Sequence, residues 1–226
     1  MSTSGSASTN AWSMPSPNGP SRWTVGGTIC QRNKIPMIPP SSTNPAVTEK
    51  GDYVFRVCYI DPYQGQALAD YLVKKLGVRT AAILVDMKTD YSTGLSQYFK
   101  EQFVKNGGRV VTLERYANGD AGQMKAAVQR VAQAARGADA IFVPDNAPEI
   151  AQALSGAGVD LRRAVLLGTG LWDDPATLNS PAVAGGLFAA PESTGWNSFS
   201  QRYQSRYGQM PVRTATLAYD AVLLAA

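Results

Sequence analysis

Histidine is absent from all 226 residues of the chain. This absence excludes Ser-His-Asp and Cys-His catalysis and the two-histidine zinc motif. The two cysteines, Cys30 and Cys58, cannot hold a zinc ion by themselves. They form either a disulfide or two buried thiols, and the apolar run around Cys58 favours thiols. Only carboxylate or lysine chemistry remains open to an enzyme, so we expect a non-enzymatic protein without metal or cofactor.

Long apolar runs and runs of like charge are also missing. No stretch approaches the roughly 18 apolar residues that a membrane-spanning helix needs, and the N-terminus lacks the charged and apolar regions of a signal peptide. The formal net charge is +4, but the basic residues are scattered without a basic stripe. We therefore expect no membrane span, no export signal in this chain and no nucleic-acid partner.

Charged and large apolar residues are scarce in the first 28 residues, which consist mostly of Ser, Thr, Asn, Gly and Pro. Such a composition buries too little apolar surface to offset the entropy lost on ordering. The sequence therefore predicts a disordered low-complexity tail over residues 1–28.

Short aliphatic and β-branched runs alternate with segments whose apolar residues recur at helical spacing. This alternation predicts an α/β fold in which parallel sheets are flanked by helices. In such sheets, ligands bind beyond the carboxyl ends of the strands. The predicted strands are 35–38, 54–59, 80–85, 109–113, 140–143 and 164–167, and a further short apolar run lies at 187–190. The predicted helices are 64–76, 92–106, 123–135, 147–156, 196–207 and 214–226.

The loop P-P-S-S-T-N-P follows the first predicted strand. Its prolines prevent further strand pairing, and the hydroxyls of Ser41, Ser42 and Thr43 suit a carboxylate or another small anion. Ser, Thr and Asn are equally typical of helix N-caps and turns. The residue types alone leave both interpretations open.

Two further loops follow predicted strands. In residues 85–95, Tyr91 can cover the apolar face of a ligand or pack against its own loop. The G-T-G of residues 168–170 lacks the third glycine and the immediate helix of a dinucleotide site. We expect this second loop to bring Trp172 and Asp173 to the crevice, as an indole wall and a partner for an ammonium group. The alternative is that Asp173 or Asp174 caps a helix at Pro175.

These motifs carry a resemblance to a known family. From about residue 29 to 119 the sequence resembles the branched-chain amino-acid binding proteins of ABC importers, in the type I periplasmic-binding-protein superfamily, because S-x-T-N-P, G-D-Y-V-F-R and D-P-x-Q-G occur in order. From about residue 138, the segments L-L-G-T-G-L-W-D-D-P and R-T-A-T-L-A-Y-D-A-V are more similar to the penicillin-binding-protein activator branch. This change raises the hypothesis of a recombined chain with a junction near Asp120.

The resemblance implies two lobes that close on a ligand. It implies that Ser41, Ser42 and Thr43 hold the ligand's carboxylate and that Tyr91 contacts the ligand from the other lobe. The family's ammonium-binding acid falls near Gly170 in this sequence, so Asp173 is the available substitute.

The resemblance also implies a division of the chain, a function and partners. Residues 61–190 match a complete second lobe, residues 29–60 and 191–226 match a partial first lobe, and residues 1–28 match neither. The implied function is a periplasmic solute-binding protein that serves an ABC permease and binds an amino acid. Because a partial lobe exposes apolar surface and a strand edge, we also expect a homodimer. The alternatives are a regulator similar to the activators and a scaffold without a working site.

Overall fold

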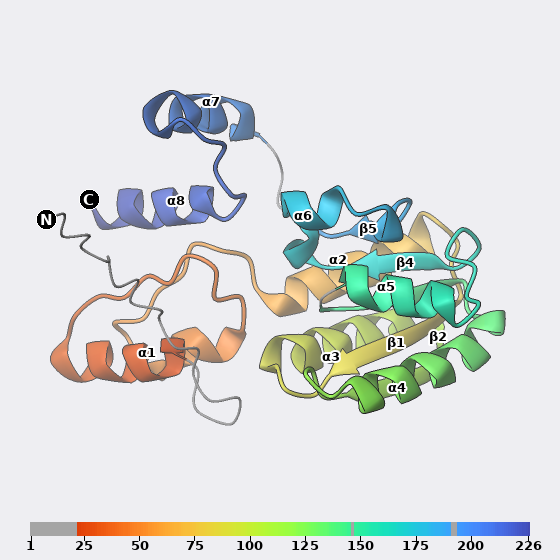
Figure 1. Cartoon of the computed structure of the whole chain (residues 1–226). Coiled ribbons are helices and arrows are strands. Elements are labelled where there is room, and N and C mark those ends of the chain that lie inside the picture. The colour runs from red at the N-terminus through yellow and green to blue at the C-terminus, as the bar shows by residue number, and fades with distance from the viewer. Residues whose placement is uncertain (1–21, 146, 191–193) are drawn as a thin grey trace, which may run out of the picture.

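A five-stranded parallel sheet forms the centre of the fold (Figure 1), with strand order β2-β1-β3-β4-β5. The computed structural model describes residues 22–145, 147–190 and 194–226. Neighbouring strands are all parallel, which confirms the predicted α/β class. The strands are β1 (Thr80–Asp86), β2 (Arg109–Tyr116), β3 (Ala140–Phe142), β4 (Val165–Gly168) and β5 (Leu187–Phe188).

Helices cover both faces of this sheet, as the alternating pattern predicted. On one face lie α2 (Asp61–Lys74) and α3 (Asp90–Lys105), and on the other lie α4 (Ala121–Ala134) and α5 (Ala147–Gly156). The short helix α6 (Pro175–Leu178) follows β4. Successive residues of β1 point into opposite cores, Ala82 and Leu84 into one and Ile83 and Val85 into the other. Burial on both faces explains why residues 81–85 of this strand are all apolar.

Three helices lie apart from the sheet, on the left of Figure 1: α1 (Arg22–Asn33), α7 (Trp196–Tyr207) and α8 (Ala215–Ala225). We call residues 61–190 the sheet unit, and residues 22–60 together with 194–226 the flanking segments. Among the described residues, no helix is long and apolar enough to span a membrane.

The predicted tail is wrong for residues 22–28, which form the first part of α1. Gly26 and Gly27 give Met37 close access to this helix, because their Cβ positions would lie 3.4 Å from its sulfur and methyl atoms. The backbone N–H of Tyr53 donates to Gln31 Oε1 of α1 at 2.9 Å. These contacts with distant residues order the helix. The rest of the predicted tail, residues 1–21, lies outside the described residues.

The predicted strands 35–38 and 54–59 are also wrong. These segments make a single parallel bridge between Met37 and Val54. Its hydrogen bonds run from Met37 N to Tyr53 O and from Phe55 N to Met37 O, both at 2.8 Å. The prolines on either side of Met37 have no backbone N–H to donate, so the pairing does not extend into a ladder.

Asp70 links α2 to α3. Its carboxylate accepts hydrogen bonds from Lys74 Nζ at 2.7 Å, Gln102 Nε2 at 2.6 Å and Asn106 Nδ2 at 2.7 Å. The bond from Lys74, followed by those from the two amides, holds the pKa of Asp70 well below its usual range. The charged form of this carboxylate therefore stabilises the packing of the two helices.

We expect Asp70→Asn to remove a pH-dependent part of the stability. Because the folded-state pKa lies below the unfolded value of about 3.9, the contribution is present above that value and is lost as the pH falls below about 4. Urea unfolding at several pH values should show the difference between wild type and Asp70→Asn shrinking on acidification. The side chain of Asp70 is 38% exposed, so salt should reduce the difference too. Glu101→Gln on the exposed face of α3 is the control, and a difference that grows in acid would contradict this assignment.

Candidate functional site

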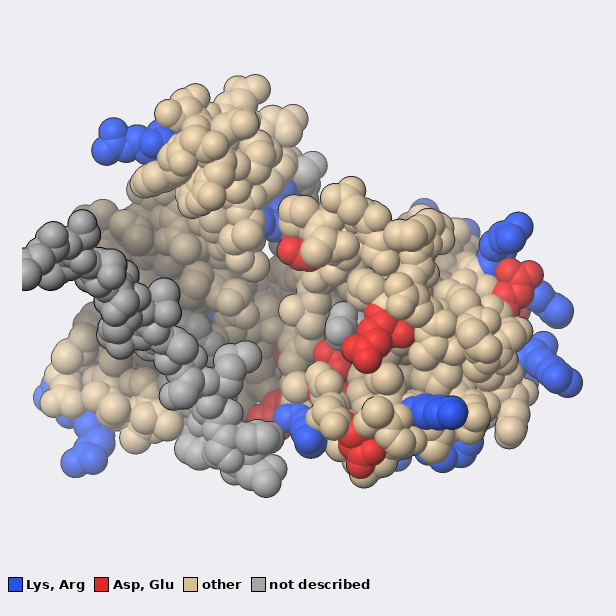
Figure 2. Space-filling view, in the orientation of Figure 1, with Lys and Arg blue, Asp and Glu red and all other residues tan. Residues whose placement is uncertain are grey.

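A cavity of about 510 Å³ lies between the sheet unit and the flanking segments. Figure 2 shows the surface hollowed between these two parts. The sheet unit contributes the start of α3 and the loop after β4, while the flanking segments contribute the loop before residue 45, the end of the 22–60 segment, and α7 and α8. The volume is typical of sites for small organic ligands.

The Ser-rich loop caps a helix and also lines the cavity. Ser41 and Thr43 line the cavity. Asn44 caps the short 3₁₀ helix η1 (Pro45–Lys50), because its Oδ1 accepts a hydrogen bond from Ala46 N at 3.0 Å. Ser42 is buried, its hydroxyl has no hydrogen-bond partner within the described structure, and it is not among the residues that line the cavity.

Arg56 holds this loop in place. Its guanidinium donates to the carbonyl oxygens of Ser42 at 3.1 Å, Asn44 at 2.9 Å and Pro45 at 2.8 Å, and to Thr48 Oγ1 at 2.5 Å. Sequence reasoning missed this role, and the only signal for it was that an arginine ends the motif G-D-Y-V-F-R. The fork of five N–H donors in arginine suits the cluster of carbonyls that an irregular loop leaves unpaired.

The start of α2 supports the loop from the other side. The backbone N–H of Asp61 donates to the Thr43 carbonyl oxygen at 3.0 Å. The Asp61 side chain is buried, and this burial raises its pKa despite the nearby Thr43 hydroxyl and Arg56 guanidinium. The Asp61 amide therefore fixes the Thr43 backbone directly, and the Thr43 hydroxyl lies beside the buried Asp61 carboxyl in the wall of the cavity.

Two tyrosines in the wall are joined through one glutamine. The Tyr91 hydroxyl donates to Gln64 Oε1 at 3.1 Å, and Gln64 Nε2 donates to the Tyr59 hydroxyl oxygen at 3.1 Å. Burial raises the pKa of both tyrosines, so both remain neutral at physiological pH. A Cβ atom at Gly170 would overlap the Tyr59 hydroxyl. The glycine thus gives Tyr59 its place in the wall.

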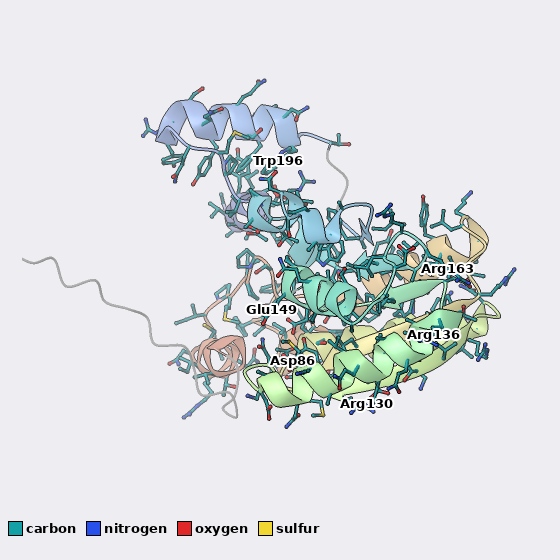
Figure 3. The ribbon with its side chains drawn as sticks, turned by 45° about the vertical axis from the view of Figure 1, so that its right-hand side comes forward. Asp86, Arg130, Arg136, Glu149, Arg163 and Trp196 are labelled. Carbon is teal, nitrogen blue, oxygen red and sulfur yellow. The ribbon has the colours of Figure 1, made fainter. Side chains whose placement is uncertain are left out.

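Asp173 reaches the cavity as predicted, but it is already paired. Its Oδ2 lies 3.1 Å from Nε of Arg213, and the Arg213 guanidinium lies 4.7 Å from the centre of the Trp196 ring. Trp196, labelled in Figure 3, begins α7, whereas Arg213 lies just before α8. The ion pair therefore connects the sheet unit to the flanking segments. The helix cap at Pro175 is Asp174, whose Oδ2 accepts from Thr177 N at 3.1 Å.

Trp172 does not form the expected indole wall. It is 2% exposed and belongs to the core beneath the sheet, where its ring lies 6.0 Å from that of Phe188. Gly168 and Gly186 leave the space that its indole fills, since a Cβ at either glycine would collide with the ring. The aromatic side chains that do line the cavity from the flanking segments are Tyr59, Trp196, Phe199 and Tyr219.

Both cysteines are thiols, as the sequence favoured, but only Cys58 is buried and Cys30 is half-buried. Cys58 lies in the cavity wall and its burial raises its pKa, whereas Cys30 lies on α1. In the described part of the chain, no three metal-ligating side chains gather where they could hold a metal ion.

Comparison with known proteins agrees with this architecture. The sequence pattern of the family described as Periplasmic binding protein matches residues 22–226. An amino acid binding protein of Pseudomonas aeruginosa is 32% identical over 137 residues, which is 55% of this chain and 36% of that protein. The Leu/Ile/Val-binding protein homolog 3 of Brucella melitensis is 32% identical over 93 residues, which is 41% of this chain and 25% of that protein.

Solved structures match over a longer stretch. The crystal structure of a leucine binding protein from Thermotoga maritima is 31% identical and superposes with a TM-score of 0.75, covering 88% of this chain and 59% of that one. A substrate-binding protein from Desulfitobacterium hafniense in complex with Leu is 25% identical with a TM-score of 0.71, covering 89% and 59%. The chain thus spans 59% of these solved relatives and no more than 36% of the two curated ones. The chain belongs to the periplasmic binding protein family, in its type I, Leu/Ile/Val-binding-protein-like branch, a family of binding proteins and not of enzymes.

Proposed function

We propose that this chain is the solute-binding component of an ABC importer and that its cavity takes a small ligand with a carboxylate and an apolar body. The observation that carries this proposal is that Ser41 and Thr43 line the same cavity as Tyr91 of the sheet unit. Hydroxyl donors and a half-buried aromatic ring in the wall of one cavity suit a small amphipathic molecule. Relatives whose names record amino-acid or leucine binding support the same function.

Each part of the site has a role in this proposal. Ser41 and Thr43 donate hydrogen bonds to the carboxylate, helped by backbone N–H groups of the loop. Tyr91, Leu171 and Phe199 contact the apolar body. The sheet unit acts as the second lobe and the flanking segments act as a partial first lobe, with a hinge at residues 58–62. The periplasm is the proposed location and an ABC permease the proposed partner.

A thermal-shift screen with the twenty amino acids and their 2-oxo acid counterparts tests this function. A ligand that binds only the folded state raises the melting temperature by an amount set by its concentration and its dissociation constant. Thr43→Ala should weaken binding about tenfold or more, because it removes a hydrogen bond to a charged group. Thr93→Ala, on the exposed side of α3, is the matched control and should bind like the wild type.

A screen without any saturable shift, from a protein that still unfolds cooperatively, would contradict the importer function. The second candidate would then replace it: a regulator similar to the penicillin-binding-protein activators, or a recombined chain that serves as a scaffold. The resemblance of residues 138–226 to that activator branch is the feature that favours this candidate.

We also propose that a second copy of the chain covers the apolar surface of α1 and α8. Val25 and Ile29 on α1 and Val222, Leu223 and Leu224 on α8 are each 45–68% exposed. A surface of this kind is unusual on a monomer. Because one chain carries both helices, a two-fold arrangement can place α1 of each copy against α8 of the other.

Light scattering should therefore report a dimer whose dissociation constant rises with Leu223→Ser. Leu178→Ser is the matched control, because Leu178 is 52% exposed on α6, which belongs to the sheet unit. Loss of about 1–3 kcal/mol of association energy is expected for an apolar side chain central to the contact. A wild-type protein that stays monomeric at high concentration would contradict the second-copy proposal.

A further inference from the structure

We propose that the ligand of this cavity is a monocarboxylate without an α-ammonium group, such as a 2-oxo acid, and not an amino acid. This inference rests on the proposed function, since it names the class of ligand for the same site. An amino acid brings two opposite charges into a closed site, and each must be matched by the protein when water leaves. The cavity offers suitable partners for only one of these two charges, the carboxylate.

Hydroxyl groups of the loop can donate hydrogen bonds to the carboxylate of the ligand. Ser41 and Thr43 line the cavity from a loop that Arg56 and the Asp61 amide hold rigid. Arg202 of α7 also lines the cavity, but it is exposed and adds little to the binding of an anion. A hydroxyl group can donate a hydrogen bond to a carboxylate, so this loop suits an anion.

The carboxylate best placed to meet an ammonium group is already neutralised. Asp173 lies in the ion pair with Arg213, at 3.1 Å, and the two side chains are only 22% and 15% exposed. Trp196 lies against the guanidinium and limits its movement away from Asp173. An ammonium ligand would have to compete with a fixed guanidinium that is already in place, in a partly desolvated site.

The wall beside Asp173 contains neutral groups that suit a carbonyl oxygen. Gln64 Nε2 donates to the Tyr59 hydroxyl oxygen, which leaves the Tyr59 O–H as a donor toward a ligand. The same hydroxyl occupies the space that a side chain at position 170 would need. A 2-oxo group accepts a hydrogen bond and fits such a donor, whereas an ammonium group only donates.

One more carboxylate, Asp220, lines the cavity from α8. It is exposed, like Arg202, so both are solvated at the rim. A solvated ion pair contributes little to binding. Asp220 therefore does not replace a buried counter-ion for an ammonium group.

Calorimetric titration with matched ligand pairs tests the inference. L-Leucine and 4-methyl-2-oxopentanoate share a carboxylate and a branched apolar body. L-Phenylalanine and phenylpyruvate share a carboxylate and an aromatic body. We expect the 2-oxo acid of at least one pair to bind about tenfold or more tightly than its amino acid, because an unmatched charge is costly to bury. Equal or tighter binding of the amino acids would overturn the ligand class and leave the importer function intact. No binding of any probe would overturn both.

A series of charge-removing variants tests the reason for the preference for a 2-oxo acid over an amino acid. Arg213→Gln leaves the Asp173 carboxylate unneutralised by that guanidinium, so it should shift the preference toward L-leucine by about tenfold. Arg213→Gln combined with Asp173→Asn removes both charges and should leave the preference as in the wild type. Circular dichroism melts establish that each variant is folded. A folded Arg213→Gln variant with unchanged preference, or a double variant that shifts like the single one, would overturn the assignment of Asp173.

Discussion

Replacing Arg56 with alanine should abolish measurable ligand binding and lower the free energy of unfolding by about 2–4 kcal/mol. The guanidinium donates four hydrogen bonds to the loop and η1, three of them to backbone carbonyls. In the alanine variant these carbonyls lose their partner, and the loop that presents Ser41 and Thr43 loses its fixed shape. Binding then requires the loop to order at the moment of contact, which costs conformational entropy.

Two variants separate this effect from a general loss of charge. Arg56→Lys keeps the charge but replaces the planar fork by a single ammonium group, so it should retain part of the stability and bind weakly. Arg136, labelled in Figure 3, is an exposed arginine on the far side of the sheet unit. Arg136→Ala should change the free energy of unfolding by less than about 0.5 kcal/mol. Urea unfolding and ligand titration of all three variants provide the comparison. An Arg56→Ala variant that unfolds and binds like the wild type would contradict the role of this arginine.

Trp172→Ala should destabilise the fold by about 3–5 kcal/mol, the usual cost of removing a large buried aromatic side chain. The indole fills the space above Gly168 and Gly186 and contacts the Phe188 ring. The residues on either side of it, Leu171 and Asp173, line the cavity. Losing the buried anchor should therefore also loosen this part of the site and weaken ligand binding.

Trp172→Phe is the matched control for this prediction. Phenylalanine keeps an aromatic ring in the slot, and it lacks the indole N–H, which has no hydrogen-bond partner among the described residues. We therefore expect Trp172→Phe to lower the free energy of unfolding by less than Trp172→Ala, by about 1–2 kcal/mol. Thermal and urea unfolding measure both variants. If Trp172→Ala and Trp172→Phe lower the free energy of unfolding by the same amount, Trp172 is not the anchor of the loop. The same conclusion follows if neither variant lowers it by more than about 0.5 kcal/mol.

The sheet and its helices were predictable because their signals are local. Residues 81–85 of β1 are all apolar because both faces of the strand are buried, and this run is visible in the sequence. The predicted helices 147–156 and 196–207 have the observed bounds of α5 and α7. Gly208 ends α7 in the left-handed conformation, a stop signal that glycine supplies without strain.

The errors share a physical cause, which is contact between residues far apart in the chain. The slot for Trp172 depends on Gly186, which the loop sequence does not contain. The segment around Met37 has the composition of a strand, but it pairs at one residue and packs its side chain on α1. The pairing of Asp173 with Arg213 likewise joins two segments that sequence spacing does not relate.

The measurement that tests the central claim most directly is hydrogen–deuterium exchange of the wild-type protein with and without saturating 4-methyl-2-oxopentanoate or L-leucine. Exchange reports local opening of the backbone, so it locates a bound ligand in the chain. A ligand in the cavity should slow exchange together in residues 41–44, 89–95 and 169–173, while α4 on the opposite face of the sheet stays unchanged. Protection confined to another surface, or no protection by either compound, would contradict a binding site between the sheet unit and the flanking segments.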